Sequence, residues 1–237
     1  MTTENTDPAK EYQGDGSPQD VLRWALDRFH PRIAVATSLQ DTVLIHMAAS
    51  IRKDVRVFSI DTGRLPEETY ACADAVRKTL GIRIEWYFPR HETVQKLETE
   101  EGLFSFKKSL EARRTCCFIR KVEPLHRALS GLDAWVTGQR KDENVTRNGL
   151  AMIERDSTHG NIVKINPLIN WSSEDVHAYI EKHHLPYNRL IDRGYPSIGC
   201  ACCTRPVEPG EDPRAGRWWW EQPEHKECGL HAGNWSI

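Results

Sequence analysis

The fold class follows from residues 55–88, VRVFSIDTGRLPEETYACADAVRKTLGIRIEWYF. The apolar runs Val55–Ile60 and Ile82–Phe88 predict two buried strands, and Pro66–Leu80 between them predicts a helix. A proline in the first turn and Gly81 just after the last residue are the expected start and stop signals of such a helix. Strands joined by helices of ten or more residues imply βαβ units and a mainly parallel sheet.

The same alternation continues outward from this unit in both directions. Further elements are expected as a helix that buries Val21, Leu22, Leu26 and Phe29, a strand at 33–36, a helix at 41–53, a long helical stretch at about 91–129, strands at 134–137 and 162–165, and a helix that Ser172 and Asp175 open at capping-box spacing. Residues 1–18 have no periodicity and predict a flexible N-terminal tail. Residues 19–237 predict a single α/β domain, irregular from about 205 and ending in a cysteine-containing tail.

The composition is that of a soluble globular protein and excludes several functional classes. The 237 residues are 39% hydrophobic and 28% charged, with a formal net charge of −2. Non-specific nucleic-acid binding needs a surplus of basic residues, which this chain lacks. No stretch approaches the roughly 20 apolar residues of a membrane span, and the polar N-terminus has no signal-peptide core. We therefore expect a cytoplasmic protein with reduced cysteines and with neither a membrane nor a nucleic acid as partner.

Four of the seven cysteines form two groups whose spacing indicates a metal centre. Cys116 and Cys117 are adjacent, and Cys200 and Cys203 form a C-x-x-C motif. Four thiolates in a cytoplasmic protein favour zinc or an iron–sulfur cluster. Because neighbours on a helix project about 100° apart, an adjacent pair reaches two irons of a cubane more easily than it converges on one zinc ion. A zinc site and buried reduced thiols remain the alternatives.

The other three cysteines lead to different expectations. Cys72 lies within a predicted helix, where a free cysteine is commonly a small buried hydrophobic side chain. Cys202 is not expected to be a ligand, because its two neighbours already satisfy the C-x-x-C spacing. Cys228 stands alone in KECGLH, close to one lysine and two histidines. Nearby cations lower the pKa of a thiol, so Cys228 is a candidate nucleophile; the alternative is an incidental exposed thiol.

Three polar loops follow predicted strands at the edge where parallel sheets bind ligands. They are Thr37–Asp41, Asp61–Arg64 and Thr137–Arg140. A helix N-terminus after the first loop could bind phosphate, and a plain helix cap explains that loop equally well. Arginine binds phosphate and sulfate through its planar fork. Basic residues recur beside the loops and the cysteines, namely Arg120, Lys121, Arg140, Lys141, Arg147, Arg205, Arg214 and Arg217.

Longer motifs resemble those of a known family. The stretches CCFIRKVEPL, WVTGQRKDENVTR, INPLINW, YPSIGCACCTRPVEPGEDPRAGRWWWE and KECGLH resemble the sulfonucleotide reductases of assimilatory sulfate reduction. The two cysteine groups resemble the branch of that family that uses adenosine 5′-phosphosulfate (APS). The resemblance implies a Rossmann-like adenine-nucleotide α-hydrolase fold. It also implies that Cys228 attacks the sulfur of APS, that AMP leaves, and that thioredoxin releases sulfite from the resulting S-sulfocysteine.

The resemblance also implies a set of site residues. It implies a 4Fe–4S cluster on Cys116, Cys117, Cys200 and Cys203, and substrate binding by Ser38, Asp61, Arg120, Lys121, Gly138, Arg140, Arg147, Arg214, Arg217 and His231. The loop TSLQD lacks the two glycines of the related ATP-pyrophosphatase loop, which argues against ATP cleavage. Two other functions stay open: reduction of the 3′-phosphorylated substrate (PAPS), and a non-catalytic iron–sulfur or redox-sensing role. The sequence leaves a homo-oligomer open as well.

Overall fold

The computed structural model describes residues 7–143 and 149–222, so Arg147, Cys228 and His231 lie outside the described residues. The strands form one sheet in the order β3-β2-β1-β4-β6-β5. Their bounds are β1 Ile33–Ala36, β2 Arg56–Ile60, β3 Ile84–Tyr87, β4 Ala134–Val136, β5 Ile153–Asp156 and β6 Ile162–Ile165. β4 runs parallel to both β1 and β6. The mainly parallel α/β fold predicted from the sequence is confirmed.

Strand β5 is missing from the sequence-based prediction. It runs antiparallel to β6, with Ile153 opposite Ile165. Its sequence is IERD, and Ile153 and Asp156 are its buried residues. A strand with one apolar residue in four gives no hydrophobic periodicity, so the pattern that finds the other strands cannot find this one.

The described residues divide into two compact units. The first comprises the described parts of Met1–Thr37, Thr42–Val57 and Gly131–Leu185, and the second those of Ser38–Asp41, Phe58–Ser130 and Pro186–Ile237. The single domain over residues 19–237 therefore stays a prediction. None of the helices in the described part of the chain is both long enough and apolar enough to span a membrane.

The first unit is built around strands β1, β4, β5 and β6. Its helices are α1 (Pro8–Glu11), α2 (Pro18–Phe29), α3 (Val43–Ile51) and α8 (Ser173–His183). α2 packs on α3, and α3 contacts β1 and α8. The predicted apolar face of α2 is buried, and so is Trp135 at the centre of β4. The predicted capping box between Ser172 and Asp175 is present at the start of α8. α1 lies in the segment that the sequence assigns to a tail.

The second unit contains the helix expected between the second and third strands. It is α4 (Glu67–Leu80), with Pro66 at its N-cap and Gly81 in the left-handed conformation, with φ of 68°, at its C-cap. A residue with a side chain would be strained at that φ, so glycine ends this helix for the reason the sequence suggests.

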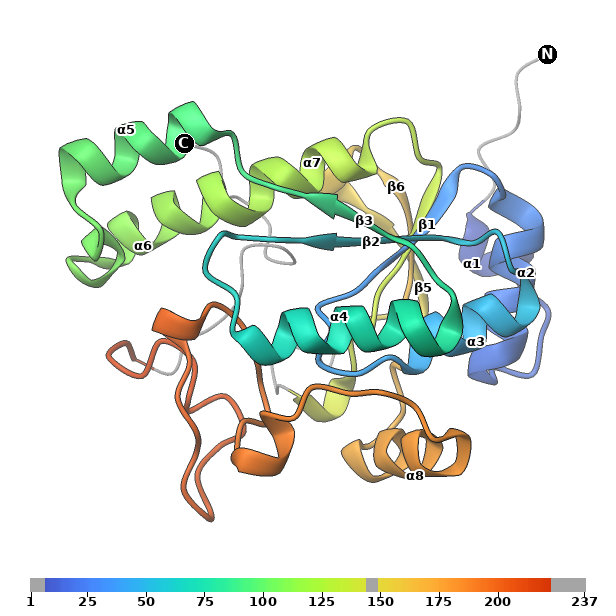
Figure 1. The fold of residues 1–237 in the computed structure, drawn as a ribbon. Helices are drawn as coiled ribbons and strands as arrows, with labels where there is room; N and C mark the ends of the chain where they lie inside the picture. Colours follow the sequence, from blue (N-terminus) through green and yellow to red (C-terminus); the bar gives the residue numbers. More distant parts are fainter. Residues whose placement is uncertain (1–6, 144–148, 223–237) are drawn as a thin grey trace. The chain divides into compact units, whose positions relative to one another are not determined.

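The long helical stretch expected at about 91–129 is divided into several pieces. They are α5 (His91–Glu101), the 3₁₀ turn η1 (Ser105–Lys107), α6 (Leu110–Cys117), the π-helical turn η2 (Phe118–Val122) and α7 (Glu123–Leu129). Gly102 ends α5 with a φ of 89°, and the Ser109 side chain caps α6. α5 lies beside the continuous α6–η2–α7 segment (Figure 1). Further short 3₁₀ turns are Lys141–Glu143, Ser157–His159, Ile191–Arg193 and Ala201–Cys203.

Candidate functional site

Four cysteines of the second unit come together in one buried cluster. Cys116 and Cys117 end α6, Cys200 is the N-cap of the turn Ala201–Cys203, and Cys203 is its last residue. Each is at most 7% exposed, and Phe106 and Trp218 complete the cluster. None of these four cysteines forms a disulfide within the described residues. No three His, Cys, Asp or Glu side chains within residues 7–143 and 149–222 are arranged to hold a single metal ion. The structure thus brings together the four residues that the sequence selects, and their role as ligands stays a prediction.

The π turn η2 places two cations beside these thiols. It begins directly after Cys117 and carries Arg120 and Lys121, which are 5% and 8% exposed. A π turn is a frequent device at functional sites, because it widens the helix and redirects side chains. Burial raises the pKa of the Cys116 thiol, and the charges of Arg120, Arg64 and Lys121 oppose that rise. The cluster is therefore a dry thiol site with positive charge around it.

Cys202 is half-buried at the edge of the cluster. Its sulfur lies 3.8 Å from that of Cys203 and 3.9 Å from Nη1 of Arg64. The hydrogen bond with Cys203 lowers the pKa of Cys202 against the opposing effect of burial, and the charge of Arg64 adds to the lowering. The same hydrogen bond, together with burial, raises the pKa of Cys203.

The loop after β2 is connected to the cysteines. The hydroxyl of Thr62 lies 3.2 Å from Sγ of Cys200, and Nη1 of Arg120 donates a 2.6 Å hydrogen bond to the carbonyl of Thr62. Asp61 is buried and accepts hydrogen bonds from the Gly63 amide at 2.7 Å and from the Tyr70 hydroxyl at 3.0 Å. Burial and the bond to Asp61 raise the pKa of Tyr70 to about 12. Asp61 is thus held rigidly in a loop that also touches the cysteine cluster.

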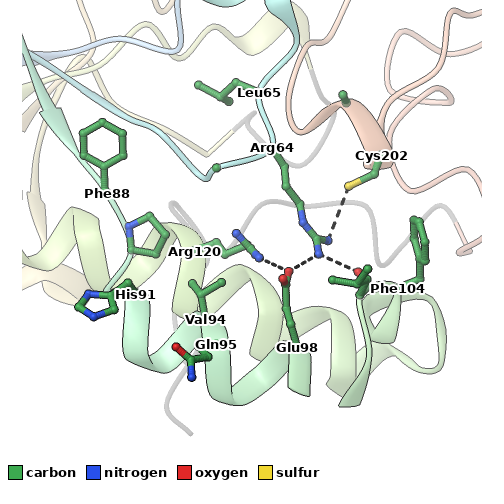
Figure 2. Close-up of a pocket in the computed structure, with 14 residues that line it drawn as sticks. Arg64, Leu65, Phe88, His91, Val94, Gln95, Glu98, Phe104, Arg120 and Cys202 are labelled. Carbon is green, nitrogen blue, oxygen red and sulfur yellow. Dashed lines mark hydrogen bonds and ion pairs between the residues drawn. The ribbon is translucent and has the colours of Figure 1, made fainter. Parts of the chain in front are cut away.

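Glu98 of α5 joins two arginines in a pocket that also reaches Cys202. Its Oε1 accepts hydrogen bonds from Nη2 of Arg64 at 2.5 Å and from Nη2 of Arg120 (Figure 2). Arg64 also donates to the Leu103 carbonyl at 2.7 Å. The pocket has a volume of about 840 Å³. The sequence places Arg64 in the candidate loop Asp61–Arg64 but does not indicate Glu98, because a glutamate within HETVQKLETEE has the pattern of a solvated helix face.

Trp218, in the last described segment, is surrounded by cations from α6, η2 and its own segment. The ring of this fully buried residue lies 4.5 Å from the Arg113 guanidinium, 4.7 Å from that of Arg217 and 5.8 Å from Nζ of Lys121. Trp218 therefore packs in the interior. Arg217 also donates to the carbonyl of Ile198 at 3.1 Å. The predicted residue Arg214 is buried in the same segment.

Gly199 lies very close to the side chain of Arg217. A Cβ at Gly199 would lie 2.2 Å from Nη2 of Arg217. Any side chain there would displace the Arg217 guanidinium, which bonds the Ile198 carbonyl and lies over the Trp218 ring.

The remaining predicted residues are distributed over both units. Ser38 is exposed in the second unit, whereas Gly138 and Arg140 belong to the first. Arg140 is buried and donates to Oγ of Ser173 at 3.3 Å. The convergence of the three strand-end loops on one crevice stays a prediction. The helix expected from Asp41 begins at Val43 instead, with Thr42 as an N-cap whose side chain makes no capping hydrogen bond.

Cys72 is buried, as the sequence predicts, with 3% exposure. Burial, with a smaller contribution from the charge of Asp41, raises its pKa to about 12.

Comparisons with known proteins give one consistent family. The chain matches the phosphoadenosine phosphosulfate reductase domain family over residues 30–206. It is 47% identical over 226 residues to an adenosine 5′-phosphosulfate reductase of Pseudomonas aeruginosa strain LESB58, covering 93% of this chain and 84% of that protein. It is 50% identical over 201 residues to an adenosine 5′-phosphosulfate reductase of Allochromatium vinosum, covering 84% of this chain and 78% of that protein.

One solved structure agrees with this assignment, and a second shares the fold. A phosphoadenylyl-sulfate reductase of Candida auris, in complex with phosphate, is similar with a TM-score of 0.68 and 34% identity, over 80% of this chain and 90% of that chain. An FMN adenylyltransferase of Candida glabrata has a TM-score of 0.58 at 12% identity, over 98% of this chain and 82% of that chain. This second likeness concerns the fold alone.

Proposed function

Because the chain belongs to the phosphoadenosine phosphosulfate reductase family, we propose that it reduces APS to sulfite and AMP in sulfate assimilation, with thioredoxin as the reductant. The proposal is supported by relatives that carry the name adenosine 5′-phosphosulfate reductase and are 47% and 50% identical over most of both chains. The structural observation that carries it is the buried cluster of Cys116, Cys117, Cys200 and Cys203. These are the residues by which the sequence resembles the APS-using branch.

The choice of substrate is tested by comparing APS with PAPS. We expect kcat/KM for APS to exceed that for PAPS by at least about tenfold, which corresponds to about 1.4 kcal/mol of differential transition-state binding. Sulfite release is measured with both nucleotides at equal enzyme and thioredoxin concentrations. Equal or reversed efficiencies would assign the chain to the PAPS-using branch.

The four clustered cysteines fit a 4Fe–4S cluster, which is held by four cysteine thiolates. They come from two segments, are buried, and have Arg64, Arg120 and Lys121 close enough to act on the Cys116 thiol. Positive charge of this kind offsets the net negative charge of an iron–sulfur cluster with four thiolates. When bound, the cluster supplies a fixed charge and a link between the two segments. Anaerobically purified protein should contain about four irons and four sulfides per chain; stoichiometric zinc without visible absorbance would contradict this assignment.

The reaction proceeds in two steps on Cys228. Its thiolate attacks the sulfur of APS, an S–S bond forms, and the bond from sulfur to the phosphate oxygen breaks, so that AMP leaves with the electron pair. A thioredoxin thiolate then attacks Sγ of Cys228, and sulfite leaves with the electrons of the S–S bond. The second thioredoxin thiol displaces Cys228 as a thiolate. Thioredoxin ends as a disulfide, and the sulfur is reduced by two electrons.

Basic residues carry the electrostatic part of this reaction. A substrate with a phosphate and a sulfate needs concentrated positive charge in a chain of net charge −2. Arg120 and Lys121 are held beside the cysteines by the π turn η2, and Arg214 and Arg217 are buried near Trp218. We assign these four to neutralising the anionic groups as AMP leaves. The substrate set is completed by Ser38, Asp61, Gly138, Arg140, Arg147 and His231.

A single-turnover experiment tests the nucleophile. Incubation with APS and no reductant should release at most one AMP per chain and leave a sulfo group on the peptide that contains Cys228. Cys228→Ser should abolish this burst and keep the visible absorbance, because Cys228 is outside the ligand set. Cys72→Ser is the matched control, since that thiol is buried in α4. Full sulfite release by Cys228→Ser, or a sulfo group on Cys203, would overturn the mechanism.

A further inference from the structure

The second unit exposes a group of large apolar side chains that the proposed chemistry does not use. Phe88, Leu103, Phe104 and Trp219 are 54%, 59%, 63% and 39% exposed. The first three line the same 840 Å³ pocket as Arg64 (Figure 2). We call these four residues the aromatic rim. Single exposed apolar residues are common on proteins, whereas a group of them beside a pocket marks an interaction surface.

Two members of the aromatic rim, Phe104 and Trp219, are connected through their neighbours. Nζ of Lys107 lies 5.7 Å from the ring centroid of Phe104 and 5.4 Å from that of Trp219. The Phe106 ring lies 6.1 Å from Phe104 and 5.9 Å from Trp220, which itself packs 4.8 Å from Trp219. Rings at these separations are in contact. The surface therefore runs from the pocket to the end of the described chain.

The chain is anchored where it leaves this surface. Glu221 pairs with Arg113 at 2.6 Å, and their side chains are 9% and 1% exposed. Cys228 follows seven residues after Glu221. Because an extended chain advances by at most about 3.3–3.6 Å per residue, the Cα atom of Cys228 lies within about 25 Å of that of Glu221. Any protein that reacts with Cys228 must bring its own thiol into this radius.

We propose that the aromatic rim is the docking surface of the dithiol protein that releases sulfite from Cys228. The proposal rests on the proposed function. A standard interface covers about 800 Å² on each partner, which is a disc of roughly 16 Å radius. The thiol of such a partner meets Cys228 within about 25 Å of Glu221. An interface of this size can therefore include the aromatic rim. Aromatic side chains are the residues enriched at the centres of such interfaces.

The chemistry at this surface is the second step of the reaction. The partner's thiolate attacks Sγ of Cys228 and forms a mixed disulfide, and sulfite leaves with the electron pair of the broken bond. The partner's second thiol then displaces Cys228, so the partner is oxidised to a disulfide and Cys228 is regenerated. A small dithiol performs the same exchange without a docking surface. The two reductants therefore separate docking from chemistry.

The test uses the holoenzyme with the double substitution Leu103→Ser and Phe104→Ser. Sulfite release is measured with thioredoxin as the varied substrate and, separately, with dithiothreitol. We expect the KM for thioredoxin to rise at least tenfold, while the AMP burst and the rate with dithiothreitol stay unchanged. Lys78→Ala, with a side chain 73% exposed on α4, is the surface control and should change neither. Trp219→Ala should raise the KM for thioredoxin in the same direction.

The outcomes separate this proposal from the proposed function. If the wild-type enzyme forms no sulfo group on Cys228, the proposed function fails. If it forms one and the double variant keeps the wild-type KM for thioredoxin, the rim is not the docking surface. Equal losses with both reductants would place the effect on Cys228 chemistry and overturn the assignment. A changed sedimentation coefficient with an unchanged KM would instead identify the rim as an interface between copies of this chain.

Discussion

Removing the Glu98 carboxylate should destabilise the second unit more than any exposed substitution on the same helix. Glu98→Ala takes away the common acceptor of Arg64 and Arg120, which are 18% and 6% exposed at their side chains. The Arg120 guanidinium keeps its hydrogen bond to the Thr62 carbonyl, but it loses the carboxylate with which it forms an ion pair. An uncompensated buried charge is among the most costly defects in a folded protein.

The size of the effect follows from the burial of the partners. Hydrogen bonds to charged groups contribute about 1.5–3 kcal/mol each. Glu98 itself is 24% exposed, so water can enter the vacated space and reduce the cost. We expect the free energy of unfolding to fall by about 2–3 kcal/mol. For a chain of this length the melting temperature should fall by about 5–10 °C. Glu98→Gln should lose less, because an amide oxygen still accepts one bond.

The measurement is thermal unfolding of anaerobic holoenzyme, with Glu101→Ala as the control. Glu101 lies on the same helix and pairs with Lys108 at 3.1 Å, and both side chains are more than half exposed. Surface pairs of this kind contribute about 0–1 kcal/mol. Glu98→Ala should also lower kcat/KM for APS, because Arg120 belongs to the proposed substrate site. If the two variants melt within 1 °C of each other, the shared carboxylate does not hold the arginines in place.

Three further outcomes follow from individual side chains. Cys200→Ser should lose the bound iron, whereas Cys202→Pro should keep it; iron analysis of both purified variants decides this, and equal iron contents would contradict the ligand assignment. Burial lowers the pKa of His46, and the charge of His183 adds to this lowering. The unfolded chain then binds a proton more readily than the folded one, so stability is full above about pH 6.5 and falls as the pH drops. His46→Gln should flatten the decline of the urea midpoint between pH 7.5 and 5.5, and the exposed His177→Gln on α8 should leave it unchanged. Cys72 should resist iodoacetamide at pH 8 in native protein and react in urea, because burial raises its pKa to about 12; equal rates in both states would refute its burial.

The sequence predicts those elements whose signals are local. β1 is a short apolar run, and α4 lies between Pro66 and Gly81, of which Gly81 has a left-handed conformation that favours glycine. The sequence does not predict β5, because this strand is stabilised by pairing with β6 rather than by its own side chains. The sequence does not predict the π turn η2 either, because one extra residue leaves the composition of a helical stretch unchanged.

The same difference applies to the candidate site. The sequence indicates the four clustered cysteines, because cysteine is a rare residue type and their spacing is typical of a metal centre. All four lie in one buried cluster of the structure. The sequence does not indicate Glu98, because it is one of several glutamates on an acidic helix. Its role follows only from its hydrogen bonds to Arg64 and Arg120 in the structure. Long-range charge pairing is set by tertiary structure, and no local pattern encodes it.

Because of the π turn, this site depends on the number of residues between Cys117 and α7 as well as on their identity. A π-helical turn holds one residue more than the α-helical turn it replaces. Deleting one residue of Phe118–Val122 would let this interval close to an α-helical turn, and any residue between the deletion and Cys117 or α7 would then point in a different direction, because each residue of an α-helix turns by about 100°. A homologue with all four cysteines but one residue fewer in this interval would therefore have to place its cations elsewhere. A gap in an alignment at this interval is thus a marker of altered chemistry, even where every ligand is retained.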